Sequence, residues 1–567
     1  MTRKHAAPWW LRHDALIIFV VTVFAFSSRL HEAHFSGTEG HRVIPALQMV
    51  MTGDWLVPRL WGVEYLAKPP LHHWTLAVFH AITGSQSEWI LRFPSALAAG
   101  ALGALLCVMG NLWFRRPVGF IAGISVLFFV ANWAQNVKAD IDGPHTLTAV
   151  AAALGFLHLG TRRQGDITAI LLTALAFGAM LLHKGPAGMP LIAGAILAPT
   201  IVGTDRRAWR RPAIWIAVAA GTAIFLIWAG AAYFAIERAT SDGDQSGVRE
   251  VVSRIGTRTA GDLLKSMALP FVLFAYGLPI TLLIPFGWMQ RTARCVAADE
   301  VDEPLARLRL RSLIVAVAVA VVIAMIANLV NPRYNFILFP LLCPVAGAVI
   351  TAWLRKAYRP SNALRLRQIG TGTAIGMLIA VCIVSVLFSR EHHVIDVGLV
   401  LHVLIVAGSA GGAVWLFIGQ RTVRALVMMS IAITFFIPIH THYRSVGSEE
   451  RSCARFANLM RDHVYRGERV LADDWVMTSP ELFLYADIDV YYKRDELSQP
   501  VAPRRPRWLV LHETEWERWK TAFPAQFTEV YAMPINRHEP VLVEFVPDGF
   551  DAWTAYPNGA SSGAEDP

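Results

Sequence analysis

Residues 312–329 read SLIVAVAVAVVIAMIANL, a run of 18 positions without a single charged side chain. A transmembrane helix needs about 20 predominantly apolar residues, because the hydrocarbon core of a bilayer is about 30 Å thick. Similar apolar runs recur through the first 440 of the 567 residues. The whole chain is 54% hydrophobic and 16% charged, whereas soluble proteins carry about 25% charged residues. The sequence therefore predicts a polytopic α-helical membrane protein.

The charge density changes near residue 440. Charged side chains number 58 in residues 1–440 and 35 in the 127 residues 441–567. We therefore expect a transmembrane domain at 1–440 and a soluble α/β domain at 441–567. Period-two and helical spacings in the second part predict the following elements: helices at 448–465 and 513–521, and strands at 469–471, 482–492, 508–512 and 541–545.

Thirteen apolar segments are candidates for crossing the membrane. They lie near 15–30, 93–113, 117–135, 145–160, 167–183, 187–203, 213–235, 267–289, 312–329, 334–354, 369–388, 397–418 and 423–440. No repeat of the kind that marks two-half transporters relates these segments.

Lysine and arginine are distributed unevenly between the connections. The connections on the side of the N-terminus hold 23 basic and 7 acidic residues. Cytoplasmic loops carry such an excess of basic residues, so we expect a cytoplasmic N-terminus and, after 13 spans, an external C-terminal domain. The net charge of +9 is then explained by membrane orientation rather than by nucleic-acid binding. The five cysteines form no disulfide framework, and the apolar composition excludes a disordered chain.

Charged residues gather in the connections on the opposite, outer side. The first of these, residues 31–92, is long and contains an apolar segment at 71–82 that predicts a helix lying in the interface. The rigid Lys68-Pro69-Pro70 segment precedes that helix. A lysine ammonium neutralises phosphate charge without needing bidentate geometry, so a lysine at a membrane face suits a lipid phosphate.

Three motifs carry these outer charges. They are GDWLVP at 53–58 followed by Gly62, KPPL at 68–71 and Trp74; HKGP at 183–186; and NPRY at 331–334 followed by Leu338 and Pro340. These motifs resemble the outer loops of bacterial GT-C membrane glycosyltransferases, the aminoarabinose transferase and dolichyl-phosphate-mannose–protein mannosyltransferase-like family. The expected architecture, with 13 spans and an outer α/β domain, is similar to that of the aminoarabinose transferases.

The resemblance implies a reaction. A sugar linked to a polyprenyl phosphate is transferred outside the cytoplasm to the hydroxyl of a lipid, glycan or protein acceptor, with anomeric inversion. Cations must stabilise the charge that grows on the departing phosphate, and a carboxylate must take the proton of the acceptor. The donor-phosphate candidates are Lys68, Lys184, Arg333 and Arg42. Glu39 is the expected general base, because Thr38 stands where the family has a second carboxylate.

Further residues are candidates for binding substrate: Asp140, Asp142, His41, His72 and Tyr334. Asp142 opens the segment Asp142-Gly-Pro-His145, at the place where the family often has an aspartate. A divalent metal stays an open question. The family's metal-binding glutamate corresponds to Ala67 here, although histidines of the long loop could replace ligands.

Two other functions stay open. A flippase or transporter of lipid-linked sugars would share the apolar chain, although such proteins carry charges near the bilayer midplane rather than in outer loops. An oligosaccharyl or O-antigen ligase-type transferase would use the same chemistry with a larger donor. The sequence indicates neither the sugar nor the acceptor, nor the oligomeric state.

Overall fold

The computed structural model describes the chain in two compact units. The described residues are 13–28, 30–31, 34–35, 38–60, 62–128, 130–162, 166–239, 260–297, 302–327, 332–392, 397–433, 456–458, 460, 469–472, 489–492, 508–511, 513, 516–517, 521, 527–532 and 541–545. The first unit comprises Met1–Ala33, Ala46–Pro58 and Glu64–Ser445. The second comprises His34–Pro45, Arg59–Val63 and Val446–Pro567.

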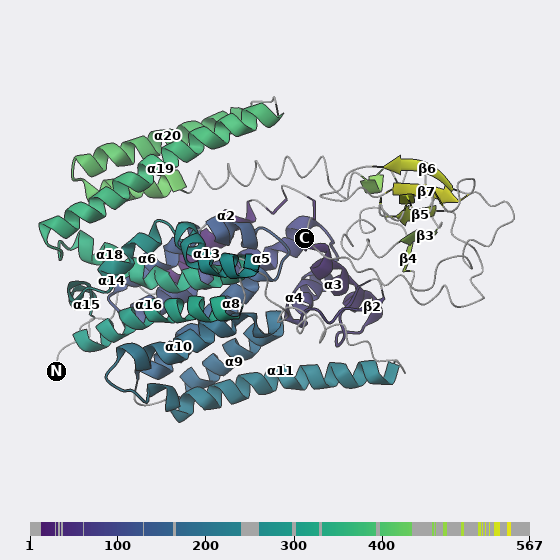
Figure 1. Cartoon of the computed structure of the whole chain (residues 1–567), viewed down its shortest axis with the longest axis horizontal. Helices are drawn as coiled ribbons and strands as arrows, with labels where there is room; N and C mark the ends of the chain where they lie inside the picture. Colours follow the sequence, from purple (N-terminus) through teal and green to yellow (C-terminus); the bar gives the residue numbers. More distant parts are fainter. Residues whose placement is uncertain are drawn as a thin grey trace. The chain divides into compact units, whose positions relative to one another are not determined.

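Helices make up the first unit (Figure 1). They are α2 (Asp14–Ser27), α3 (Gly40–Thr52, which begins in the second unit), α4 (Leu71–Thr83), α5 (Glu88–Trp113), α6 (Arg116–Ile124), α7 (Val130–Asn136), α8 (Asp142–Thr161), α9 (Ile167–Lys184), α10 (Met189–Val202), α11 (Pro212–Ala239), α13 (Ala260–Tyr276), α14 (Ile284–Gly287), α15 (Gln290–Val296), α16 (Glu303–Ile326), α17 (Pro332–Asn335), α18 (Cys343–Leu354), α19 (Pro360–His392) and α20 (Val397–Ile418). A further apolar helix covers Thr422–Ile433.

Fewer helices than expected are long enough to span a bilayer. Within the described residues, six helical segments pass by length and composition, or seven if one bent pair counts as a span. One of the six, Ile167–Val202, comprises both α9 and α10. The chain is therefore a multi-pass membrane protein, but the count of 13 spans is not reproduced. The first expected span, 15–30, is the helix α2 of 14 residues.

Two expected spans are broken. The segment 117–135 divides into α6, a 3-10 turn at Ser125–Phe128 and α7. The segment 267–289 bends by 89° between Lys265–Tyr276 and Ile280–Gly287. Pro279 lies in this bend, and proline cannot donate the backbone hydrogen bond that a continuous helix requires. Hydropathy gave the apolar stretches correctly here but not their continuity.

Small residues let the helices of the first unit approach closely. Gly194 of α10 packs against the backbone of Ala316 in α16, and Gly110 of α5 faces Gly119 of α6. Figure 1 shows α8, α9, α10 and α16 side by side, with extensive contacts between neighbours. Apolar helices in lipid associate through such packing, because the surrounding lipid removes the hydrophobic driving force between them.

The chain reverses between α9 and α10. Gly185 adopts φ +59°, which a glycine accepts without steric cost. Gly155 of α8 lies against Thr173, near the start of α9, and Gly160 lies against Pro199, near the end of α10. The first part of α9 and the end of α10 therefore both lie near the C-terminal end of α8. Lys184, the last residue of α9, lies at the turn between the two helices.

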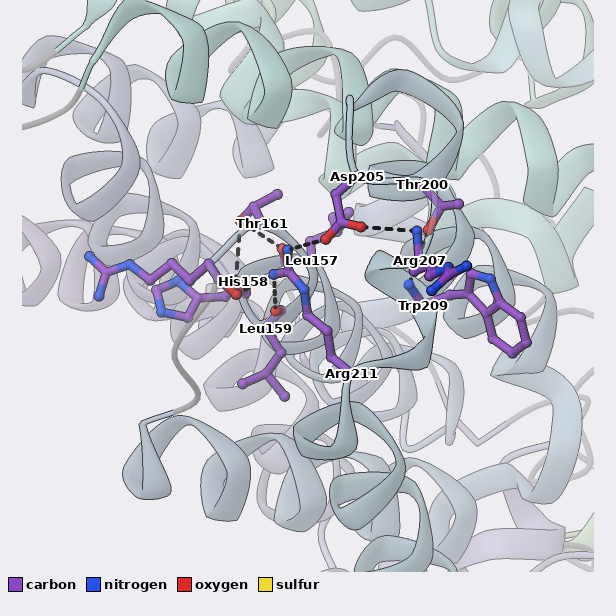
Figure 2. A network of polar contacts seen from close by, with 10 residues as sticks. Leu157, His158, Leu159, Thr161, Thr200, Asp205, Arg207, Trp209 and Arg211 are labelled. Atoms are coloured by element: carbon purple, nitrogen blue, oxygen red, sulfur yellow. Dashed lines mark hydrogen bonds and ion pairs between the residues drawn. The ribbon is translucent and has the colours of Figure 1, made fainter.

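A polar network fastens that C-terminal end of α8 (Figure 2). The Arg211 guanidinium donates to the Leu159 carbonyl at 3.1 Å and lies 3.0 Å from the Asp205 carboxylate. The Trp209 amide donates to the Thr200 hydroxyl at 3.1 Å. The network joins the end of α8, the end of α10 and the start of α11.

The second unit contains a mixed five-stranded sheet. Its strands are β3 (Arg469–Ala472), β4 (Asp489–Tyr492), β5 (Trp508–Leu511), β6 (Phe527–Ala532) and β7 (Val541–Phe545), in the order β4-β3-β5-β7-β6. β4, β3 and β5 are parallel, whereas β7 is antiparallel to both β5 and β6. A short two-stranded sheet pairs β1 (Arg59–Leu60) with β2 (Val63–Glu64).

Four of these strands fall in predicted segments, and β6 is a strand that the sequence reading missed. Most of the predicted helix 448–465 and the first part of the predicted strand 482–492 lie outside the described residues. Residues 456–458 and 460, and 513, 516–517 and 521, are helical, in agreement with the two predicted helices.

Close packing at Gly194 is testable with a matched control. Gly194→Ala should destabilise the detergent-solubilised protein by about 1–3 kcal/mol, because the added Cβ would meet the Ala316 carbonyl. Gly372→Ala, in α19, should be neutral or stabilising by up to about 1 kcal/mol, because nothing lies within 4 Å of the added atom. Thermal unfolding of both variants measures the difference, and equal shifts would contradict the packing.

Candidate functional site

An ion pair lies at the turn between α9 and α10. Lys184, the last residue of α9, contacts the carboxylate of Asp142, the first residue of α8, and the side chains are 8% and 4% exposed. A helix N-terminus favours a negative charge and a C-terminus a positive one, so both helix dipoles support the pair. The charges neutralise one another where water is largely excluded.

Tyr334 covers the same lysine. Its ring centroid lies 4.6 Å from the Lys184 ammonium, within the range of a cation–π contact. Tyr334 belongs to α17, so segments around residues 142, 184 and 334 meet at one place. Arg333 is its neighbour in α17, but the Arg333 side chain lies outside the described residues.

Three histidines surround this contact. His183 Nδ1 lies 3.3 Å from the Thr148 hydroxyl and 3.0 Å from the Ala179 carbonyl. His72, fully buried on α4, interacts electrostatically with His183, and His145 of α8 is 2% exposed and interacts with Lys184. The site is therefore rich in imidazole groups that can donate or accept hydrogen bonds.

Asp140 has a local backbone role. It is 2% exposed, and its Oδ1 accepts a hydrogen bond of 2.7 Å from the Ile141 amide. Asp142, two residues later, is therefore the carboxylate that reaches Lys184.

The first-loop motif is a folded turn rather than an open loop. Gly53 has φ +75°, and Asp54 Oδ1 accepts from the amides of residues 56 and 57 at 3.1 and 3.3 Å. Trp74 donates to the Trp55 carbonyl at 2.6 Å, and Trp228 donates to the Leu56 carbonyl at 3.1 Å. The motif thus connects the long loop to α4 and α11.

Lys68 immediately precedes the two prolines that lead into α4. Its ammonium donates to the Ala67 carbonyl at 2.9 Å, and the residue is half-buried. The helix that follows it, α4, confirms the helix predicted at 71–82 and carries His72 toward His183.

Glu39, His41 and Arg42 lie in the second unit. Glu39 is fully buried, and its carbonyl accepts from the Arg42 amide at 2.8 Å and from the Val43 amide at 2.9 Å, which starts α3. Arg42 is 4% exposed, and His41 is half-buried.

Metal ligands do not gather in the part of the chain that the structure describes. No group of three His, Cys, Asp or Glu side chains there has the geometry to hold an ion. The donor groups of the described residues do not fit a metal site.

Of the predicted residues, the structure brings Lys184, Asp142 and Tyr334 into contact, with His72 close to their neighbour His183. The sequence reading missed His183, His145 and Thr148 as parts of this cluster. His183 lies in the HKGP motif, and His145 lies in the segment Asp142-Gly-Pro-His145. The available sequence signal was a polar residue close to a charged residue in a predicted outer connection.

Comparisons with known proteins give a match to a family model and a solved structure of similar fold. The family model for dolichyl-phosphate-mannose-protein mannosyltransferase matches residues 67–228. ArnT from Cupriavidus metallidurans, solved with undecaprenyl phosphate bound, superposes with a TM-score of 0.70 and 19% identity over 95% of this chain and 98% of that one.

Curated relatives match over shorter stretches. The undecaprenyl phosphate-alpha-4-amino-4-deoxy-L-arabinose arabinosyl transferase of Aeromonas salmonicida is 33% identical over 144 residues, 24% of this chain and 26% of its own length. A protein of the same description from Pseudomonas fluorescens is 28% identical over 189 residues, 32% of this chain and 33% of its own length. The matches thus span about a quarter to a third of these relatives.

The chain is therefore a multi-pass membrane protein that shares its fold with ArnT over nearly its whole length. The chain resembles the aminoarabinose transferases in fold and, over part of its length, in sequence, which agrees with the resemblance of the motifs.

The buried ion pair should contribute to stability. Asp142→Asn leaves the Lys184 ammonium without its counter-charge, so we expect a loss of about 3–5 kcal/mol in the free energy of unfolding. Asp205→Asn is the control, because that carboxylate is 47% exposed and its pair with Arg211 is worth no more than about 1 kcal/mol. Thermal unfolding in detergent compares the two, and similar losses would rule out a special role for the buried pair.

Proposed function

We propose that the chain transfers a sugar from a polyprenyl-phosphate-linked donor to an acceptor hydroxyl, on the outer face of the inner membrane and with inversion. One observation carries the proposal: a buried lysine, held by Asp142 and covered by Tyr334, at the turn of an apolar helix pair. The fold shared with a protein solved with undecaprenyl phosphate bound supports the lipid-phosphate donor.

Lys184 suits a phosphate that leaves with growing charge. Its ammonium is oriented in advance by Asp142, so little reorganisation is required when the donor arrives. Asp142 is then a positioning residue for Lys184. Lys68, Arg333 and Arg42 complete the proposed set of phosphate-binding cations.

The reaction is a single displacement. The acceptor oxygen attacks the anomeric carbon, the bond from that carbon to the phosphate oxygen breaks, and polyprenyl phosphate leaves with the electron pair. The acceptor's proton passes to a carboxylate, which we assign to Glu39. His41, His72 and Tyr334 are the proposed contacts to sugar or acceptor.

The domain assignment follows from the same proposal. Residues 1–440 would form the transmembrane glycosyltransferase domain, with the base Glu39 in its long outer loop 31–92, and residues 441–567 would form a soluble external α/β domain. In the structure, the second unit groups the C-terminal residues from Val446 onward with the stretch His34–Pro45, which carries Glu39.

A transfer assay with purified protein and a polyprenyl-phosphate sugar tests the donor site. Lys68→Ala should lower kcat/KM by about 10–100-fold, as expected for loss of a charge-assisted contact, while Lys68→Arg loses less. Lys138→Ala, which removes a half-buried lysine outside the proposed set, is the control. Movement of the lipid-linked sugar across the membrane without formation of a new glycoside would instead establish a flippase.

Glu39→Gln tests the general base. The variant keeps the size of the side chain but removes its basicity, so kcat should fall by about 10²–10⁴-fold with donor binding unchanged. Glu64→Gln, a half-buried glutamate of the same long loop, should leave kcat near the wild-type value. Wild-type turnover in Glu39→Gln would exclude Glu39 and shift the assignment to Asp140 or Asp142.

A further inference from the structure

A cavity lies far along the chain from the proposed donor site. It occupies about 910 Å³ and is lined by the end of α18, the connection from α18 to α19, the first turns of α19, and the connection that follows α20. The volume is within the range of cavities that hold small-molecule ligands. None of the residues proposed for sugar transfer lines it.

The cavity is strongly basic. Lys356, Arg367, Arg421 and Arg424 line it, and none of its lining residues is an aspartate or glutamate. Among the described residues, none of these four cations forms a salt bridge to a carboxylate. Tyr358 adds no negative charge, because burial raises its pKa to about 12 and its hydroxyl lies 2.6 Å from Thr292. The cavity therefore presents uncompensated positive charge.

The backbone supports a role for these side chains. Lys356 and Gln420 are the non-glycine residues with positive φ in the described part of the chain, at 56° and 59°, and both line the cavity. Each follows a helix that ends in a Schellman motif, with the Ala357 amide bonded to the Ala352 carbonyl and the Arg421 amide to the Leu416 carbonyl. Glycine is the usual residue at this position, so Lys356 and Gln420 each place a side chain at a position where the backbone disfavours one.

One wall of the cavity is apolar. Trp353 stacks on Phe417 with ring centroids 6.1 Å apart. Leu364 and Val423, which also line the cavity, are 44% and 61% exposed. A ligand that fills this space therefore meets both cations and exposed hydrocarbon, which matches an amphiphile.

The position along the helix matches the level of lipid headgroups. The apolar segment Phe336–Leu354 is long enough to cross a bilayer. It begins two residues after Tyr334, at the Lys184 site, and it ends at the cavity, which Leu354 lines. The two sites therefore lie at opposite ends of a segment that is long enough to cross a bilayer. Basic pockets between transmembrane helices are suited to anionic lipid headgroups.

We propose that this cavity binds an anionic phospholipid, with its phosphate among Lys356, Arg367 and Arg421 and its acyl chains along Leu364 and Val423. The site is independent of the sugar-transfer reaction. An inorganic phosphate ion shares the headgroup's chemistry but cannot use the apolar wall.

Native mass spectrometry of the full chain in detergent tests the proposal, with phosphatidylglycerol and phosphatidylcholine as probes. We expect phosphatidylglycerol to bind at least about tenfold more tightly than phosphatidylcholine. Arg367→Gln with Arg421→Gln should weaken phosphatidylglycerol about fivefold for each arginine removed. Arg365→Gln is the matched control, because Arg365 is exposed on the same helix and does not line the cavity. Excess inorganic phosphate should not displace the lipid.

Three results would overturn the proposal. Equal affinity for the two lipids would remove the headgroup contact, and an equal loss in Arg365→Gln would indicate only a diffuse basic surface. Displacement by inorganic phosphate would indicate a free-anion site.

Lys356→Gly separates binding from folding. Glycine relieves the positive φ at this position, so the melting temperature should stay the same or rise while phosphatidylglycerol affinity falls about fivefold. A fall in melting temperature with unchanged affinity would mean that Lys356 only shapes the turn, and it would count against the proposal.

Discussion

The buried contact between the Lys184 ammonium and the Asp142 carboxylate is the interaction on which the arrangement of the site depends. Both side chains are almost withdrawn from water, and an isolated charge in such a place would cost several kcal/mol. The start of α8 and the end of α9 must therefore lie together. Because α10 begins directly after the turn at Gly185, its direction follows from the same contact.

Much of the membrane fold could be predicted from the sequence, because apolar composition is a local property. The segments 145–160 and 397–418 correspond closely to α8 and α20. Whether a helix continues without a break is not a local property of the sequence in the same way. The break in 117–135 and the 89° bend in 267–289 depend on how neighbouring helices pack around 3-10 turns and prolines, and hydropathy averages over them.

The site was predictable as a set of residues but not as a set of contacts. The sequence could identify Lys184, Asp142 and Tyr334 as candidate site residues, because each lies in or beside a motif in a predicted outer connection. Their pairing could not be read from spacing, since Asp142 and Lys184 are 42 residues apart in the sequence. For the same reason, the sequence did not identify His145 as a site residue. A histidine at the start of an apolar helix shows no pattern of its own until the opposite helix brings Lys184 and His183 to it.

Positive charge is balanced differently at the two ends of the segment Phe336–Leu354. At the Tyr334 end, a buried lysine carries its counter-ion inside the protein. At the Leu354 end, Lys356 and Arg367 line a cavity without such a counter-ion among the described residues. A cation at headgroup level can take its counter-ion from the bilayer, whereas a cation among apolar helices cannot. On the proposed functions, the first arrangement suits a donor phosphate that must arrive and leave, because Asp142 balances the lysine charge when the phosphate is absent. The second suits a lipid that stays, because its departure would leave several like charges facing one another.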